Sequence, residues 1–305
     1  MNFLFIFLDG VGLGSDDPET NPLAKASMPN LASLLGGNRL VSSTSPYFGT
    51  LADLLPLDAS LGVGGLPQSA TGQAVLLTGQ NIPAEIGYHY GPKPNEPVAT
   101  YLRNGNLFSQ LAINGKKAAF LNAYPPRYFE AIDSGKRLFS AIPLAVSSAG
   151  FPLHTRTDLL QGRAIAADFT AQGWHDHLGL TDTPVMQPEQ AGRLLAELSR
   201  KYDFAFFEYW LSDYVGHHQN MGEAVQILQI LDQVLGGLIK AWDHDRGLIL
   251  LTSDHGNLED LSTRRHTLNL VPGLVIGSKV LRKHFSARLH SLADVTPAIL
   301  DLYKS

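Results

Sequence analysis

The fold is indicated first by a run of six apolar residues near the start of the chain, Phe3-Leu4-Phe5-Ile6-Phe7-Leu8. An uninterrupted apolar run of this length, bounded by a turn, is typical of a strand that is buried on both faces. Such strands occur in parallel sheets that helices cover on either side. The run ends at Asp9-Gly10, so we expect a carboxylate at the point where this strand leaves the sheet.

Three further apolar runs have the same character and alternate with helical patterns. The runs lie at 118–121, 204–207 and 248–252, and the helical patterns before them lie at about 106–114, 187–201 and 221–242. A late strand is expected at 270–276 and a closing helix at 291–302, with Ser291 as a candidate N-cap. Strands that alternate with helices form βαβ crossovers. The sequence therefore predicts an α/β protein, a three-layer αβα sandwich around a mostly parallel sheet.

The stretch from about residue 123 to 188 interrupts this alternation. It contains Pro125-Pro126, several glycines and only weak periodicity. We interpret it as a small insertion or lid rather than as part of the sheet. A length of 305 residues allows two domains at most. We therefore expect a single core domain over residues 1–305 that contains this insertion.

The composition excludes several classes of protein. Hydrophobic residues make up 44% of the chain and charged residues 17%, values typical of a folded globular protein. The formal charge is −5 and there is no long basic run, so nucleic acid is not an expected partner. The chain has no cysteine, which excludes disulfides, thiolate metal sites and a cysteine nucleophile. Any metal must then be held by oxygen and imidazole groups.

The N-terminal apolar run does not have the features of a targeting signal. It has only six residues and lacks both a basic start and a small-residue cleavage site. No other stretch approaches the roughly 20 apolar residues of a membrane span. We therefore expect a cytoplasmic protein without a membrane partner. No pattern in the sequence predicts an oligomeric state.

Carboxylate and imidazole side chains follow three of the predicted strands, and one further histidine precedes the last strand. These residues are Asp9, Asp213, His217, Asp254, His255 and His266. Ligands bind beyond the carboxyl ends of strands in open parallel sheets, because loops and helix N-termini converge there. Three aspartates and three histidines at such an edge suit one or two divalent cations of the Zn or Mn type. For any single position, a capping aspartate or a buried histidine is the alternative interpretation.

A loop that runs into a helical segment at 68–79 carries hydroxyl groups at its start, on Ser69 and Thr71. A helix N-terminus offers free N–H groups and a positive dipole end, which suit a phosphate or a developing alkoxide. A serine in this position can also serve only as a helix cap. Beside a metal site, such a hydroxyl is a candidate nucleophile, because a metal lowers the pKa of a hydroxyl group.

Taken in order along the chain, these motifs resemble the alkaline phosphatase superfamily. The motifs are Asp9, Ser69-Ala70-Thr71-Gly72, Asp213-Tyr214-Val215-Gly216-His217, Ser253-Asp254-His255-Gly256-Asn257 and His266-Thr267. They look most like the branch that contains cofactor-independent phosphoglycerate mutase and phosphopentomutase. The resemblance implies one metal held by Asp213, His217 and His266, and a second held by Asp9, Asp254 and His255. It also implies a nucleophile at Ser69, with Thr71 as the rival because other branches use threonine.

The resemblance implies phosphate transfer through a phosphoserine intermediate. The mutases carry a large cap domain whose arginines hold the substrate and exclude water, whereas the 123–188 stretch is short and has no match to that arginine-rich motif. A phosphoenzyme that is open to water is expected to hydrolyse. We therefore expect a metal-dependent phosphate ester hydrolase, a phosphatase, that acts on a small-molecule phosphate ester. A phosphomutase, a phosphodiesterase or nucleotide pyrophosphatase, and a non-catalytic metal-binding relative are the alternatives.

The ligand types accept both Mn and Zn. The branch that the chain resembles uses Mn, so we expect two divalent metal ions and favour Mn over Zn. Asn257 and Glu259 are expected to orient the ligands. His218 and the segment 174–177 (Trp-His-Asp-His) are expected to lie outside the site.

Overall fold

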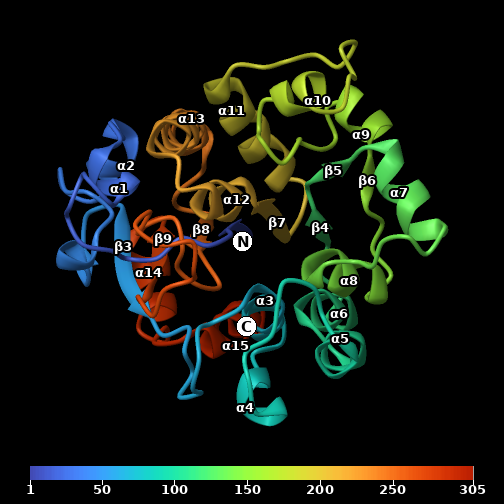
Figure 1. Cartoon of the computed structure of the whole chain (residues 1–305), viewed down its shortest axis with the longest axis horizontal. Helices are drawn as coiled ribbons and strands as arrows, with labels where there is room; N and C mark the ends of the chain where they lie inside the picture. The colour runs from blue at the N-terminus through green and yellow to red at the C-terminus, as the bar shows by residue number, and fades with distance from the viewer. Residues whose placement is uncertain (305) are drawn as a thin grey trace.

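A seven-stranded sheet forms the centre of the computed structural model, which describes residues 1–304 (Figure 1). The strand order is β2-β3-β9-β8-β1-β7-β4. The strands are β1 (Asn2–Leu8), β2 (Tyr47–Phe48), β3 (Ala52–Leu57), β4 (Ala118–Phe120), β7 (Phe204–Tyr209), β8 (Gly247–Thr252) and β9 (Val271–Ile276). β4, β7, β1 and β8 pair in parallel, whereas β9 and β2 run antiparallel to their neighbours. The predicted mostly parallel sheet is confirmed.

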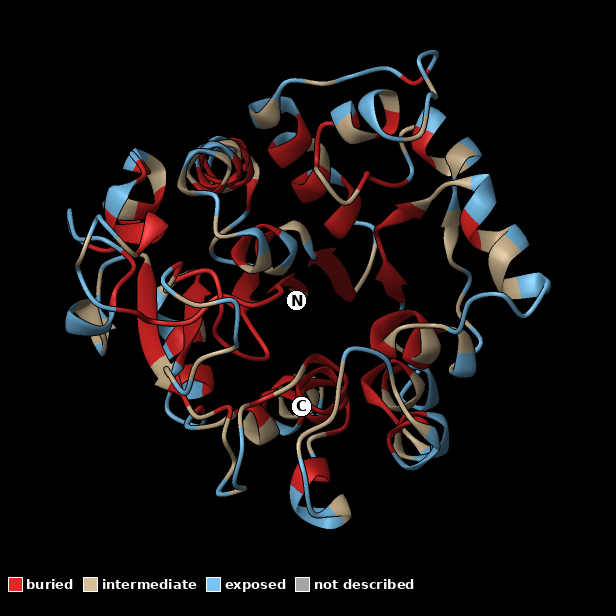
Figure 2. Cartoon of the chain, in the orientation of Figure 1, coloured by how far each residue is buried: buried red, intermediate tan, exposed pale blue. Residues whose placement is uncertain are grey.

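Alternate side chains of β1 point into two separate hydrophobic layers, the even-numbered ones into one and the odd-numbered ones into the other. The first layer is covered by α1 (Pro22–Lys25), α2 (Pro29–Leu34), α11 (Pro188–Ser199), α12 (Leu211–His218) and α13 (Met221–Ala241). The second is covered by α3 (Ser69–Thr78), α5 (Glu96–Asn104), α6 (Leu107–Ile113), α8 (Ala141–Ser148), α14 (Lys279–Ser286) and α15 (Val295–Asp301). Figure 2 shows the buried strands between these helices. The three-layer αβα sandwich is therefore confirmed.

Most predicted elements lie within two residues of their expected bounds: α6, α11, α13, β4, β7, β8 and β9. The predicted closing helix is divided, because Ser291 caps a 3-10 turn, η2 (Leu292–Asp294), that precedes α15. β3 is absent from the predictions, since Asp53 and Pro56 interrupt its apolar pattern. Two short elements lie in loops, η1 (Ser42–Thr44) and α4 (Ile82–Ile86).

No strand of the 123–188 stretch belongs to the seven-stranded sheet, but the stretch takes part in a small two-stranded sheet that the sequence did not predict. β5 (Ala123–Tyr124) and β6 (His154–Thr155) pair in parallel, and each is too short to leave a periodic pattern in the sequence. The stretch also contains α7 (Pro126–Asp133), α9 (Arg156–Leu160) and α10 (Gln172–Asp176). α8 lies within it too, but Ile142 and Val146 of this helix pack into the second hydrophobic layer. A role of the stretch as a lid stays a prediction.

α13 is the one helix of residues 1–304 that is long and apolar enough to cross a membrane by length and composition. More than half of its most apolar window is buried. It packs mainly against α11 and also contacts α1 and α2, with Leu231 and Leu235 in the first hydrophobic layer. This burial is the pattern of a core helix in a layered α/β fold.

Candidate metal centre

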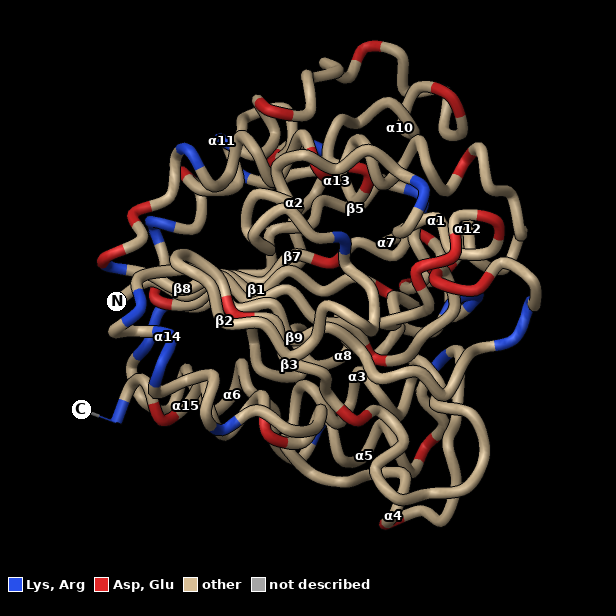
Figure 3. Tube along the Cα trace, turned by 90° about the vertical axis from the view of Figure 1, so that its left-hand side faces the viewer, with Lys and Arg blue, Asp and Glu red and all other residues tan. Residues whose placement is uncertain are grey.

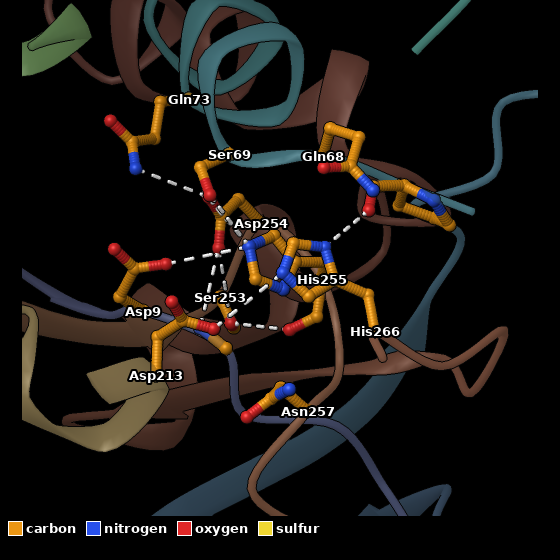
Figure 4. A network of polar contacts seen from close by, with 12 residues as sticks. Asp9, Gln68, Ser69, Gln73, Asp213, Ser253, Asp254, His255, Asn257 and His266 are labelled. Atoms are coloured by element: carbon orange, nitrogen blue, oxygen red, sulfur yellow. Dashed lines mark hydrogen bonds and ion pairs between the residues drawn. The ribbon is translucent and has the colours of Figure 1, made fainter. Parts of the chain in front are cut away.

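Three neighbouring strands end at the same edge of the sheet. Leu8 at the end of β1 lies opposite Tyr209 at the end of β7, and Phe7 lies opposite Thr252 at the end of β8. The residues that follow these strands therefore leave the sheet side by side. Figure 4 shows that they meet there with the first residue of α3, Ser69. The structure thus brings the residues predicted from three strand ends into one cluster.

Asp213, His217 and His266 form one group whose possible ligand atoms lie within 4.8 Å of one another. Nε2 of His217 lies 3.3 Å from Oδ2 of Asp213, and Nε2 of His266 lies 3.8 Å from Oδ1 of Asp213. Nδ1 of His217 contacts the carbonyl of Arg264, and Nδ1 of His266 contacts the carbonyl of Pro67, each at 2.8 Å. Because a carbonyl partner places the proton on Nδ1, each Nε2 keeps its lone pair available for a cation.

A second group consists of Asp9, Asp213 and His255. Nε2 of His255 lies 3.5 Å from Oδ1 of Asp9 and 3.6 Å from Oδ2 of Asp254. The sequence analysis placed Asp254 in this group and Asp213 only in the other. In the structure Asp213 belongs to both groups, and Asp254 borders the second through His255. The rings of His255 and His266 stack with centroids 3.7 Å apart, so the two groups form one continuous cluster.

Burial sets the protonation of this cluster. It raises the pKa of Asp9 well above its ordinary value, and the nearby charges of Asp254 and Asp213 raise that pKa further. Burial also raises the pKa of Asp254 to about 7 and lowers the pKa of His255. At Asp213 burial opposes ionisation, but the hydrogen bond with His217 and the nearby histidines lower its pKa on balance. Positive charge placed among these buried carboxylates would stabilise their ionised forms.

The side chains present fit divalent cations. Oδ1 of Asp9 and Oδ1 of Asp213 are buried and have no hydrogen-bond partner among the residues that the structure describes. A buried carboxylate oxygen without a partner costs free energy, and a bound cation removes that cost. Oxygen and imidazole donors together suit Mn or Zn. The cluster therefore meets the requirements of the metal site that the sequence predicts.

Ser69 is the first residue of α3 and faces the cluster. Its Oγ lies 3.0 Å from Nε2 of His255 (Figure 4). α3 approaches the loop after β8 closely at Gly72, where a Cβ would lie only 2.8 Å from Cβ of Asp254. A glycine at this position therefore allows α3 to present Ser69 to the cluster.

Thr71, the rival candidate nucleophile, is fully buried and has local partners. Its Oγ1 lies within hydrogen-bond distance of the carbonyls of Gln68 and Tyr90, at 3.1 and 3.3 Å. The same oxygen accepts the backbone N–H of Tyr90 at 3.1 Å. These contacts attach the loop that carries Tyr90 to the start of α3. Of the two hydroxyls, that of Ser69 is the one that contacts the cluster.

Glu259, which the sequence predicted only from its position, joins three loops around the cluster. One carboxylate oxygen accepts the backbone N–H groups of Gly12, at 2.9 Å, and Asn257, at 2.8 Å. The other accepts from the hydroxyl of Thr267 and from Nδ2 of Asn269. Glu259 thereby links the loop after β1, the loop after β8 and the segment that carries His266.

Two polar residues near the cluster were missed by the sequence analysis. Gln73 donates from Nε2 to Oδ2 of Asp254 at 3.2 Å, one turn along α3 from Ser69. Glu208 is buried near the end of β7, where Tyr124 contacts its carboxylate at 3.5 Å. Burial raises the pKa of Glu208 to about 7, with a further contribution from Asp254. The signal for Glu208 is present in the sequence, because it is a charged residue inside an apolar strand.

Other residues considered in the sequence lie outside the cluster. His218 is on the same helix as His217, but it contacts Glu223, at 3.9 Å, and belongs to neither ligand group. Residues 174–177 lie in and directly after α10, and His175 contacts the carbonyl of Thr183. The side chain of Arg264 donates to Gln219. In the described part of the chain, none of these residues belongs to either ligand group.

Comparison with known proteins adds independent findings. The family model described as Metalloenzyme superfamily matches residues 179–304. The 2,3-bisphosphoglycerate-independent phosphoglycerate mutase of Desulforudis audaxviator is 35% identical over 128 residues, which cover 38% of this chain and 25% of that protein. The enzyme of the same name from Thiobacillus denitrificans is 36% identical over 121 residues, which cover 37% and 23%. The match thus spans about a quarter of the length of these relatives.

Solved structures are similar over almost the whole chain. The PH0037 protein of Pyrococcus horikoshii has a TM-score of 0.57 at 16% identity and covers 99% of this chain and 96% of its own. The alkaline phosphatase of the Antarctic bacterium TAB5 has a TM-score of 0.56 at 14% identity, with coverages of 99% and 97%. Leishmania mexicana phosphoglycerate mutase has a TM-score of 0.52 at 12% identity, with coverages of 99% and 95%. Identities this low show the fold alone.

The sequence match and the fold agree with each other. The family model covers α12, the loop after β8 and His266, and so includes five of the six predicted ligands, all except Asp9. The likeness in fold extends to the remaining elements, including β1 and α3. The chain has an alkaline phosphatase-like fold, and its residues 179–304 match the family model described as Metalloenzyme superfamily.

Proposed function

We propose that this protein is a phosphate ester hydrolase that uses two divalent metal ions and forms a phosphoserine intermediate at Ser69. The observation that carries this proposal is the contact of 3.0 Å between Oγ of Ser69 and Nε2 of His255. It places a hydroxyl at the N-terminus of a helix and at the border of a cluster of carboxylates and imidazoles. A nucleophile, a helix dipole and cation ligands are the parts that phosphoryl transfer requires.

The ligands of the proposed metal ions come from the two overlapping groups. Asp213, His217 and His266 would hold one ion, and Asp9, Asp254 and His255 would hold the other, with Asp213 at the border between them. Bound metal ions supply positive charge that favours the ionised nucleophile and offsets the negative charge of the phosphate. We favour Mn over Zn, as the resemblance implies.

The remaining steps belong to the protein's own side chains. The Ser69 hydroxyl loses its proton to solvent as Oγ attacks phosphorus. The bond from phosphorus to the alcohol oxygen breaks, and that oxygen takes up a proton from solvent, so that the alcohol leaves. Water then attacks the phosphoserine ester, which releases inorganic phosphate and restores the Ser69 hydroxyl. The positive end of the α3 dipole points toward the position of the phosphate throughout. Gln73 and Glu259 hold the surrounding carboxylate and loops in place.

Hydrolysis, rather than transfer to a second hydroxyl, is supported by the exposure of one side of the cluster. The side chain of His217 is 41% exposed and that of Asp213 is 18% exposed. Water therefore has access to the site from the α12 side. A phosphoenzyme that water can reach hydrolyses unless the site closes.

A phosphomutase is the second candidate, and the sequence relatives favour it. The two relatives described above are both called 2,3-bisphosphoglycerate-independent phosphoglycerate mutase, but the match covers only about a quarter of each. Isomerisation of phosphoglycerate without release of inorganic phosphate would support this candidate. A small-molecule phosphate ester as substrate and a cytoplasmic location are part of the proposal under either candidate.

The test measures release of inorganic phosphate by protein that has been stripped of metal and then supplied with Mn or Zn. A simple alkyl phosphate monoester, the corresponding diester and phosphoglycerate are compared, with Ser69→Ala as the matched control. Metal-dependent hydrolysis of the monoester that is lost in the control supports the proposal. Preference for the diester would instead identify a phosphodiesterase. Turnover of none of the three by protein that binds metal would contradict catalytic phosphate transfer and leave a metal-binding relative.

A further inference from the structure

Two aromatic side chains at the start of α12 are largely exposed. Trp210, directly before the helix, is 45% exposed, and Tyr214, one turn later, is 52% exposed. Their rings are held edge to face with centroids 6.2 Å apart. His218 contacts the other side of the Tyr214 ring, with centroids 4.1 Å apart. Neighbouring exposed aromatic rings in fixed positions are typical of a binding surface.

This aromatic pair lies beside the proposed ligands of α12. Trp210 has helical backbone angles, and successive helical residues are about 100° apart around the axis, so Trp210 and Tyr214 project within about 60° of His217. The opposite side of the helix carries Ser212 and Val215, which are buried. The exposed rings therefore border the cluster and do not belong to the core.

A second aromatic pair lies on the loop that is attached to the start of α3. Tyr88 is 44% exposed, and its ring lies 6.1 Å from that of Tyr90. The backbone of Tyr90 is bonded to Thr71, two residues from the proposed nucleophile Ser69. Figure 1 shows α12 and α3 on opposite sides of the strand ends. The loop that carries these two rings is thus attached to the start of α3, close to Ser69.

Basic side chains do not contact the proposed ligands directly. Among residues 1–304, no Lys or Arg side chain forms a hydrogen bond or ion pair with Ser69 or with a side chain of the two ligand groups. The side chain of Arg264, close in sequence to His266, donates to Gln219. Figure 3 shows acidic residues gathered around α12. On the α12 side the nearby charges are thus mainly acidic, which favours an uncharged planar ring over a second anionic group beside Trp210 and Tyr214.

We propose that the phosphate ester hydrolysed at Ser69 carries a planar aromatic ring on its alcohol part, and that Trp210 and Tyr214 bind this ring. The proposal rests on the proposed function, because it concerns the alcohol part of the same substrate. In this proposal, Trp210 and Tyr214 bind the leaving alcohol, whereas Ser69 and the cluster bind the phosphate.

The test compares benzyl phosphate with cyclohexylmethyl phosphate, which have similar size and similar leaving alcohols but differ in planarity. We expect kcat/KM of the metal-loaded protein to favour the benzyl ester about five- to tenfold, as ring stacking allows. Trp210→Ala should abolish this preference, and Trp210→Phe should retain most of it. Phe48→Ala, which removes an exposed ring from β2 far along the sheet, should leave the preference unchanged.

A second measurement does not depend on turnover. Benzylphosphonate has no ester bond to break, and its binding should change the fluorescence of the wild-type protein, which has three tryptophans. Trp210→Phe should remove this change. An unchanged signal in Trp210→Phe would show that the ring binds elsewhere and would overturn the proposal.

The two proposals fail in different ways. If neither ester is hydrolysed by metal-loaded protein, the proposed function fails and this inference fails with it. If both esters are hydrolysed with equal kcat/KM, the proposed function stands and the aromatic subsite is overturned. If Trp210→Ala lowers turnover of both esters equally, the residue has a structural role and the subsite is likewise overturned.

Discussion

Oγ of Ser69 lies 3.0 Å from Nε2 of His255, although 186 residues separate the two in the chain. The contact exists because α3 starts where the loop after β8 leaves the sheet, with Gly72 allowing the close approach. The contact is between the hydroxyl predicted from the sequence to be the nucleophile and a histidine predicted to be a metal ligand. The chemistry that we propose depends on this contact, and the first prediction tests it.

Ser69→Ala should lower turnover by at least about a thousandfold, because its Oγ is the proposed nucleophile and loss of a nucleophile is typically that costly. Metal content should be unchanged, since Ser69 belongs to neither ligand group. Phosphate release and metal analysis of the same preparations check both statements.

Thr71→Ser provides the matched comparison for this variant. It keeps the hydroxyl that contacts Gln68 and Tyr90, so turnover should stay close to that of the wild type. Thr71→Ala removes this hydroxyl. Normal turnover in Ser69→Ala together with loss in Thr71→Ala would show that the nucleophile is assigned to the wrong residue.

Asp213→Asn should reduce binding of both metal ions, because Asp213 belongs to both ligand groups. His217→Ala should affect only one ion, since His217 belongs to a single group. We expect about two ions per wild-type chain, about one in His217→Ala and fewer than one in Asp213→Asn, because each ion loses a carboxylate ligand. Metal analysis after dialysis measures these ratios.

His218→Ala is the control for the metal measurements, because His218 is adjacent in sequence but outside both groups. It should retain the wild-type metal content. Loss of one ion in this variant, or retention of both in Asp213→Asn, would contradict the arrangement of ligands that the structure suggests.

Much of the fold could be predicted because the central strands are buried on both faces. The predicted apolar runs that correspond to β1, β7 and β8 contain no charged residue. Each of these strands is followed by an aspartate or histidine that can bind a metal ion. Parallel strands end at one edge, so the clustering of Asp9, His217 and His255 followed from the topology. That reasoning needed no knowledge of the loops between the strands.

Other features could not be read from the sequence because they depend on contacts between distant segments. β3 contains Asp53 and Pro56, and the charge of Asp53 is accommodated only by the buried Arg282 of α14. The shared position of Asp213 depends on how α12 is turned against the end of β1, which no spacing in the sequence specifies. Glu208 was overlooked because the predicted strand ended at residue 207, whereas β7 continues to Tyr209.

Glu259→Gln should destabilise the protein by about 3 kcal/mol, since an amide can accept at only one of the two positions and leaves buried donors without partners. The donors involved are the backbone N–H groups of Gly12 and Asn257 and the side chains of Thr267 and Asn269. Urea unfolding of the metal-free protein measures the change. Glu197→Gln, on the exposed side of α11, is the control and should change stability little. Equal stability of the two variants would show that Glu259 does not hold the loops together.

Glu208 should make the stability of the metal-free protein depend on pH. Burial raises its pKa from an ordinary value of 4.5 to about 7. Between these values the folded chain keeps the proton that the unfolded chain has released, so stability falls as the pH rises through this window. A shift of this size corresponds to about 3 kcal/mol at full ionisation. Glu208→Gln cannot ionise and should remove this part of the pH dependence.

The difference between Glu208→Gln and the wild type isolates this residue from the other buried acids, Asp9 and Asp254, whose raised pKa values act in the same direction. The variant should match the wild type near pH 4 and exceed its stability by up to about 3 kcal/mol near pH 8. Urea unfolding at both pH values, in the presence of a chelator, provides the measurement. A constant difference at the two pH values would mean that the pKa of Glu208 is the same in the folded and unfolded protein, because only a difference in pKa between the two states makes stability depend on pH.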